Sequence, residues 1–166
     1  MILRFLNKYR DIGLLILRIG LGSMFLFHGA PKCFGGPEKW ERLGTAMGNL
    51  GIHFIPVFWG FMAGFSEFFG GLCIILGLFF RPACILLLLT MTVAAVSHFS
   101  KGDGLGGASH AIEDGIVFLS LIFMGPGKYS LNEFLKRSGR PGRNQVDSNT
   151  GGDYGSKTER TQNPSH

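Results

Sequence analysis

Four apolar segments constrain the fold of this chain more strongly than any other feature. They occupy about residues 12–28, 54–80, 82–98 and 110–125. A helix needs roughly 20 apolar residues to cross a bilayer, so the second segment is long enough and the others extend toward the interface. Only 16% of the residues are charged, which is low for a soluble domain. We therefore predict an all-α integral membrane four-helix bundle over residues 1–137.

Basic residues lie outside these segments and are distributed unevenly between the two sides. One side holds the larger set: Arg4, Lys8, Arg10, Arg81, Lys128, Lys136, Arg137, Arg140 and Arg143. The other side holds the smaller set: Lys32, Lys39, Arg42 and Lys101. Because short cytoplasmic loops are enriched in Lys and Arg, we predict that both ends of the chain are cytoplasmic. The net charge of +5 then favours anionic lipid, and no nucleic-acid-binding motif is present.

Two regions outside the spans have their own patterns. Pro37 opens a short segment in which Trp40, Leu43, Met47 and Leu50 share one helical face. This predicts a short interfacial helix between the first and second spans. Residues 138–166 are rich in Gly, Ser, Asn and charge, so a disordered cytoplasmic tail is expected.

Ionisable residues inside the spans are costly in hydrocarbon and need partners. At ~1.5 Å per residue, Arg18 lies roughly 9 Å and Glu67 roughly 10 Å from the same face of the bilayer core. We predict an Arg18–Glu67 ion pair. Such a pair can fix helix register, or it can take part in binding or proton movement, and the sequence leaves both readings open.

A second polar group is expected at the opposite end of the spans. Its members are His28, Lys32, His98, His110, Glu113 and Asp114. Such a set can hold a quinone or another polar ligand, relay protons, or only cap helix ends in the headgroup region. The spacing of its histidines and carboxylates merely permits metal ligation, so no metal site is predicted. The chain also lacks a C-x-x-C-H haem motif, a C-x-x-C pair and a Gly-rich dinucleotide loop, so neither haem nor NAD is expected.

Several short motifs recur at the expected helix ends. They are His28-Gly29, Phe34-Gly35, Ser66-Glu67-Phe68-Phe69-Gly70-Gly71, Leu76-Gly77-Leu78, Arg81-Pro82, His98 to Gly102, and Gly125-Pro126-Gly127-Lys128-Tyr129-Ser130-Leu131. In this order they resemble the DoxX family, over about Asp11 to Leu135. The resemblance implies a small four-helix protein of the bacterial inner (plasma) membrane. The family is named for similarity to a subunit of a thiosulfate to quinone oxidoreductase, and some members are thought to sit in membrane oxidoreductase complexes linked to thiol and oxidant stress.

The resemblance leads us to expect a membrane subunit of a quinone-linked oxidoreductase system. It would anchor soluble oxidoreductase partners, and the chain could also form homo-oligomers. The residues expected to bind quinone are His28, Lys32, Glu67, His98, His110 and Glu113. An alternative is a transporter or channel for a small solute or proton, with Glu67 and Arg18 as its gate, and a third is a structural scaffold.

Overall fold

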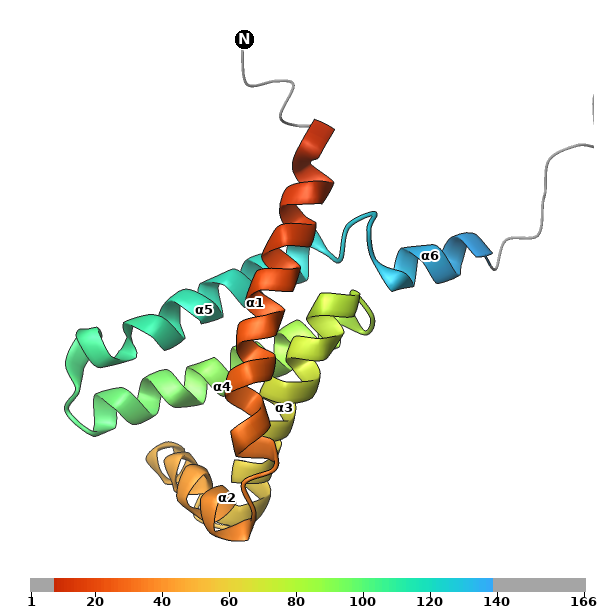
Figure 1. Cartoon of the computed structure of the whole chain (residues 1–166). Helices are drawn as coiled ribbons and strands as arrows, with labels where there is room; N and C mark the ends of the chain where they lie inside the picture. The colour runs from red at the N-terminus through yellow and green to blue at the C-terminus, as the bar shows by residue number, and fades with distance from the viewer. Residues whose placement is uncertain (1–7, 139–166) are drawn as a thin grey trace, which may run out of the picture.

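The computed structural model of this chain describes residues 8–138. Within that range the chain forms helices and turns and no strand. Four helices in this range are long and apolar enough to cross a membrane (Figure 1): α1 Arg10–Cys33, α3 Pro56–Leu76, α4 Phe80–Ser100 and α5 Gly104–Met124. Three shorter elements complete the order: α2 Pro37–Gly44, the 3-10 helix η2 Thr45–Leu50, and α6 Leu131–Ser138. The prediction of an all-α four-span membrane protein is confirmed.

The helices alternate in direction and so define two ends of the bundle. The Arg81 end is the end at which α1 starts, α3 leads into α4, and α5 ends. At the other, the Lys32 end, α1 leads into α2 and α3 begins. The turn between α4 and α5 is on the same side of the spans by chain order, and in Figure 1 it lies to the left, apart from α2, because α4 and α5 cross α1 obliquely. Of the predicted tail at 138–166, all but Ser138 lies outside the described residues.

Three spans are longer than predicted. α4 extends two residues beyond each end of the predicted 82–98. α1 continues through Pro31 to Cys33 instead of ending near residue 28, because a proline in the last turn removes one hydrogen bond without breaking the turn. α5 begins at Gly104 rather than at residue 110, so the glycine-rich stretch before His110 is helical.

The turn between the second and third spans is shifted from its predicted position. The sequence placed the break at Arg81-Pro82, but α3 ends at Leu76 because Gly77 adopts the left-handed conformation, with φ of 66°. The amides of Gly77 and Leu78 then bond the carbonyls of Ile74 and Cys73 at 3.2 and 3.1 Å, which satisfies the end of the helix. Pro82 lies in the first turn of α4, where its missing N–H is no loss.

A seam of four glycines joins α1 to α3. Gly22 of α1 faces Gly71 of α3, Gly29 of α1 lies against the backbone of Glu67 and Phe68, and Gly64 of α3 lies against Lys32 and Cys33. The two glycines on each helix are seven residues apart. A Cβ at Gly64 would lie 2.7 Å from the amide nitrogen of Cys33. Small residues let helix backbones approach closely in lipid, where packing drives helix association. This glycine seam fixes the register between α1 and α3.

The predicted short helix between the first and second spans forms, and it packs against α3. A Cβ at Gly60 of α3 would collide with the Trp40 carbonyl, and one at Gly44 with Pro56. The rings of Trp40 and Phe61 meet edge to face, with centroids 5.0 Å apart. α2 therefore continues along the face of α3 that α1 leaves at Cys33, a change from the predicted position on the membrane surface alone.

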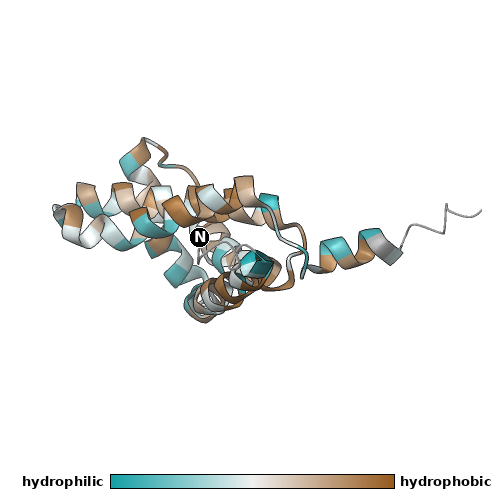
Figure 2. Cartoon of the chain, turned by 90° about the horizontal axis from the view of Figure 1, so that it is seen from above, coloured by the Kyte–Doolittle hydropathy of each residue, from teal (hydrophilic) through white to brown (hydrophobic). Residues whose placement is uncertain are grey.

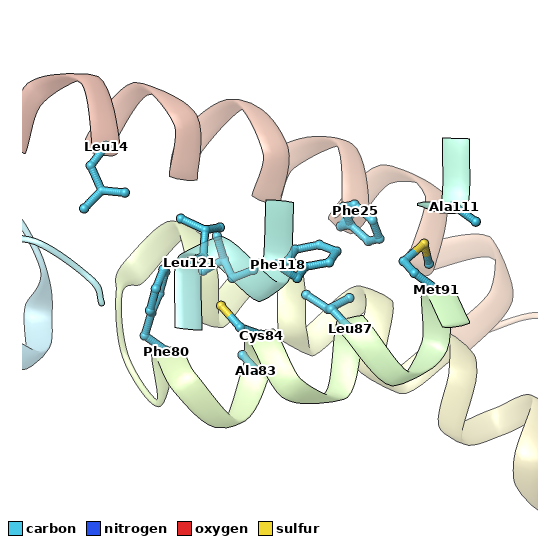
Figure 3. Packing of buried hydrophobic residues seen from close by; sticks show 11 residues of the cluster. Leu14, Phe25, Phe80, Ala83, Cys84, Leu87, Met91, Ala111, Phe118 and Leu121 are labelled. Carbon is cyan, nitrogen blue, oxygen red and sulfur yellow. The ribbon is translucent and has the colours of Figure 1, made fainter. Parts of the chain in front are cut away.

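The apolar core lies between the α1–α3 pair and the α4–α5 pair (Figure 3). Ile74, Cys84, Leu87, Phe118 and Leu121 are fully buried there. The rings of Phe25 and Phe118 meet edge to face at 4.9 Å and link α1 to α5. The core holds the two helix pairs together, and many outward side chains are exposed and apolar (Figure 2), as expected of helices that face lipid.

Candidate functional site

Lys32 and Glu67 form a partly buried ion pair between α1 and α3. The Lys32 ammonium donates to both carboxylate oxygens of Glu67, at 2.7 Å to Oε1 and 2.6 Å to Oε2. The Glu67 side chain is 4% exposed, whereas that of Lys32 is 33% exposed. Gly29 explains the contact, because its missing side chain brings α1 against the backbone of Glu67 one turn below Lys32.

The predicted Arg18–Glu67 ion pair is wrong. Arg18 is buried, and its guanidinium bonds backbone carbonyls instead: Nε to Ile74 at 2.9 Å and Nη2 to Ile75 at 2.7 Å. The depth estimate failed because it used incorrect helix ends. With α3 ending at Leu76, its last carbonyls lie beside Arg18, whereas Glu67 comes about two turns earlier in the helix.

Arg18 also fixes the segment that follows α5. Its Nη1 donates to the carbonyls of Pro126 and Tyr129 at 2.8 and 3.0 Å. Unpaired carbonyls at a helix end attract cations, so the guanidinium suits the C-terminus of α3. Arg81 acts similarly on α5, donating through Nε to the Ile122 carbonyl at 3.2 Å. We assign Arg18 a structural role, because its hydrogen bonds go to backbone and its side chain is shielded from lipid and water.

A second polar group lies around Asp114, midway along α5. Its carboxylate is half-buried and interacts electrostatically with His110, Glu113 and His28. The helical spacing of His110, Glu113 and Asp114 had predicted this neighbourhood. His28 donates through Nδ1 to the Met24 carbonyl at 2.9 Å, so Nε2 of the neutral ring is an acceptor.

His98 does not join either group. Its Nδ1 donates to Asp103 Oδ2 at 2.8 Å across the turn between α4 and α5, where both side chains are partly exposed. The single polar cluster predicted from sequence is therefore divided among an ion pair, a carboxylate group and a turn. In the described part of the chain, no three His, Cys, Asp or Glu side chains gather closely enough to hold a metal ion.

Trp40 is a site residue that the sequence analysis did not find. Its indole Nε1 donates to the carbonyl of Lys32 at 2.9 Å and so fixes the last turn of α1, which carries the ammonium. The only signal was its place on the apolar face of a short amphipathic helix. That pattern predicts burial against something apolar, and it does not reveal a hydrogen bond to α1.

Comparison with known proteins identifies the family. The DoxX family model matches residues 13–99, which is more than half of the chain. The chain belongs to the DoxX family. The match covers α1 to α4 almost completely and includes Arg18, Lys32 and Glu67, while the His110 and Glu113 region of α5 lies outside it.

Two relatives of this DoxX-family chain match along nearly their whole length. An uncharacterized protein of Haemophilus influenzae is 32% identical over 139 residues, which cover 80% of this chain and 98% of the relative. A Bacillus subtilis protein named "Putative oxidoreductase CatD" is 28% identical over 137 residues, 82% of this chain and 97% of that protein. No solved structure matches the chain.

Proposed function

We propose that this chain is a membrane subunit of a quinone-linked oxidoreductase system and that Lys32 binds the quinone headgroup. The observation that carries the proposal is the Lys32–Glu67 ion pair, a partly buried charge pair between two spans with one partner accessible. Charged side chains within membrane spans are costly, so they commonly mark binding sites or proton pathways. When bound, a quinone accepts two electrons and two protons and becomes a quinol.

The residues present fit a quinone carbonyl. An ammonium has three donors, and Glu67 accepts two of them. The third donor and the one-third exposure of Lys32 leave a hydrogen bond for a carbonyl oxygen. Glu67 holds the ammonium in place. His28 lies one turn before Lys32 on α1 and interacts electrostatically with Asp114, so these two side chains can relay protons.

Electrons would come from a soluble partner that the chain anchors, with thiosulfate or a thiol as donor. The name of the Bacillus subtilis relative supports an oxidoreductase system. The three cysteines of this chain are free, and Cys33 and Cys84 are buried in the bundle, which makes them poor candidates for a thiol relay.

The orientation inferred from charge belongs to the same proposal. We place the chain in a bacterial plasma membrane with both ends in the cytoplasm, because the Arg81 end carries the larger basic set. A phosphatase that is active only outside the cytoplasm tests this. Fused after Ser138 it should stay inactive, and fused within the turn at Gly102 it should be active. The opposite pattern would reverse the orientation.

The site is tested by measuring retained quinone. The protein is extracted gently from its own membrane, and quinone is quantified by mass spectrometry for the wild type, Lys32→Gln and Lys101→Gln. Lys101 is a matched control, since it is an exposed lysine in the turn between α4 and α5 at the same end. Quinone should be retained by the wild type and the control and lost from Lys32→Gln.

A second readout is the rate of quinone reduction, driven by thiosulfate or a thiol, in membranes with and without the chain. The rate should fall without the chain and stay low when Lys32→Gln is supplied. A ligand-free protein, together with unchanged reduction rates, would refute the proposal. If proteoliposomes of that ligand-free protein showed a flux that Glu67→Gln abolishes, the chain would be a transporter.

A further inference from the structure

α6, the short helix after the last span, has a strongly two-sided surface. Leu131, Phe134 and Leu135 recur at the spacing of one helical face, and they are 42%, 65% and 56% exposed. Glu133 and Lys136 lie on the opposite face. Figure 2 shows brown and teal residues alternating around α6, which projects away from the other helices there and in Figure 1. A helix with its apolar side so exposed needs a surface to cover it.

The start of α6 is fixed at the Arg81 end of the bundle. Ser130, just before the helix, is buried, and its hydroxyl oxygen accepts a hydrogen bond from the Glu133 amide at 3.3 Å. The Ser130 side chain lies against Gly77 in the turn between α3 and α4. The preceding carbonyl, of Tyr129, is held by Arg18 at 3.0 Å. α6 therefore begins at the level where the spans end, which is the level of the lipid headgroups.

The surroundings of α6 favour an anionic lipid surface. Apolar exposure continues from the end of α5, where Phe123 is 79% exposed and Met124 44% exposed, so lipid already covers the neighbouring surface. Exposed cations outnumber carboxylates at this end: Lys8, Arg10, Arg81, Lys128 and Lys136 stand against Asp11 and Glu133. Basic residues beside an apolar helical face are typical of helices that lie on anionic membranes.

We propose that α6 is a membrane-surface helix that inserts Leu131, Phe134 and Leu135 among the lipids and binds anionic headgroups through the basic residues of the Arg81 end. Since Ser130 and Tyr129 join α6 to α3 and Arg18, the helix holds the end of the bundle to the bilayer surface. The proposal is independent of the quinone site.

The experiment uses the full chain in vesicles and measures labelling by a water-soluble maleimide. Phe134→Cys reports the apolar face, and Lys136→Cys, on the opposite face of the same helix, is the matched control. Both side chains are exposed, so neither substitution disturbs the bundle. The wild type, whose cysteines lie within the spans, gives the background. Vesicles contain either phosphatidylglycerol with phosphatidylcholine or phosphatidylcholine alone.

In phosphatidylglycerol vesicles, Phe134→Cys should be labelled at least several-fold more slowly than Lys136→Cys. The difference should shrink in phosphatidylcholine or in 0.5 M salt, because salt screens headgroup attraction. Equal labelling of the two positions in every lipid would overturn the proposal. If the slow labelling of Phe134→Cys disappeared when the protein is diluted in lipid, the apolar face of α6 would bind a second copy of the chain. If slow labelling were seen only in native membranes, that face would bind a protein partner.

Discussion

Replacing Arg18 by lysine should destabilise the bundle although the charge is kept. The guanidinium binds the end of α3 through Nε and Nη2 and the Pro126 and Tyr129 carbonyls through Nη1. A lysine has one nitrogen, so it can serve one of these two carbonyl pairs and not both. Losing two hydrogen bonds from a charged donor, at ~1.5 kcal/mol each, lowers the free energy of unfolding by about 3 kcal/mol.

The measurement is reversible unfolding in mixed micelles, with increasing sodium dodecyl sulfate and helicity as the signal. Arg81→Lys is the control, because Arg81 is exposed and makes one backbone hydrogen bond, at 3.2 Å. Its expected cost is about 1 kcal/mol or less. If Arg18→Lys unfolded within about 0.5 kcal/mol of the wild type, the guanidinium would not be what holds the Arg81 end together.

Two further predictions concern the α1–α3 pair. Glu67→Gln should lower the free energy of unfolding by roughly 3 kcal/mol, because it leaves the Lys32 charge without its partner, and adding Lys32→Met should restore most of that loss. The same unfolding assay measures both variants. If the losses of the two single variants simply added in the double variant, the ion pair would not be what stabilises this contact. Gly29→Ala should separate α1 from α3, since its Cβ would meet the Glu67 backbone, and should lower the thermal midpoint. Gly20→Ala, with open space around it, should leave the midpoint unchanged or raise it slightly; equal effects would show that the seam does not fix the spacing.

Much of the fold could be predicted because hydrocarbon imposes simple rules on sequence. Length, hydropathy and the family motifs were enough to find the four spans and the short helix after Pro37. Helix ends were harder, because they depend on local geometry. Gly77, which has a positive φ, ends α3 five residues before Pro82, and Pro31 does not end α1.

Those errors explain what was predicted and missed at the site. Because α1 continues to Cys33, Lys32 lies on the helix and reaches the Glu67 carboxylate. A first span that ends near residue 28 does not predict this partner. The partners of Arg18 are backbone carbonyls, which every residue has, so no side-chain pattern can reveal them. The start of α6 could have been predicted from the Ser130-x-x-Glu133 sequence, which is typical of a capping box at a helix N-terminus.

The bonds of Arg18 have a consequence for the order in which the chain enters its membrane. Arg18 lies in α1, but its farthest acceptor, the Tyr129 carbonyl, comes 111 residues later in the chain. Until then its charge lacks a complete set of hydrogen-bond acceptors, so placing α1 alone in hydrocarbon is energetically costly. We therefore expect α1 to stay beside the insertion machinery until the segment after the last span has been made. Insertion would then be completed by the loop that supplies the last acceptors of Arg18.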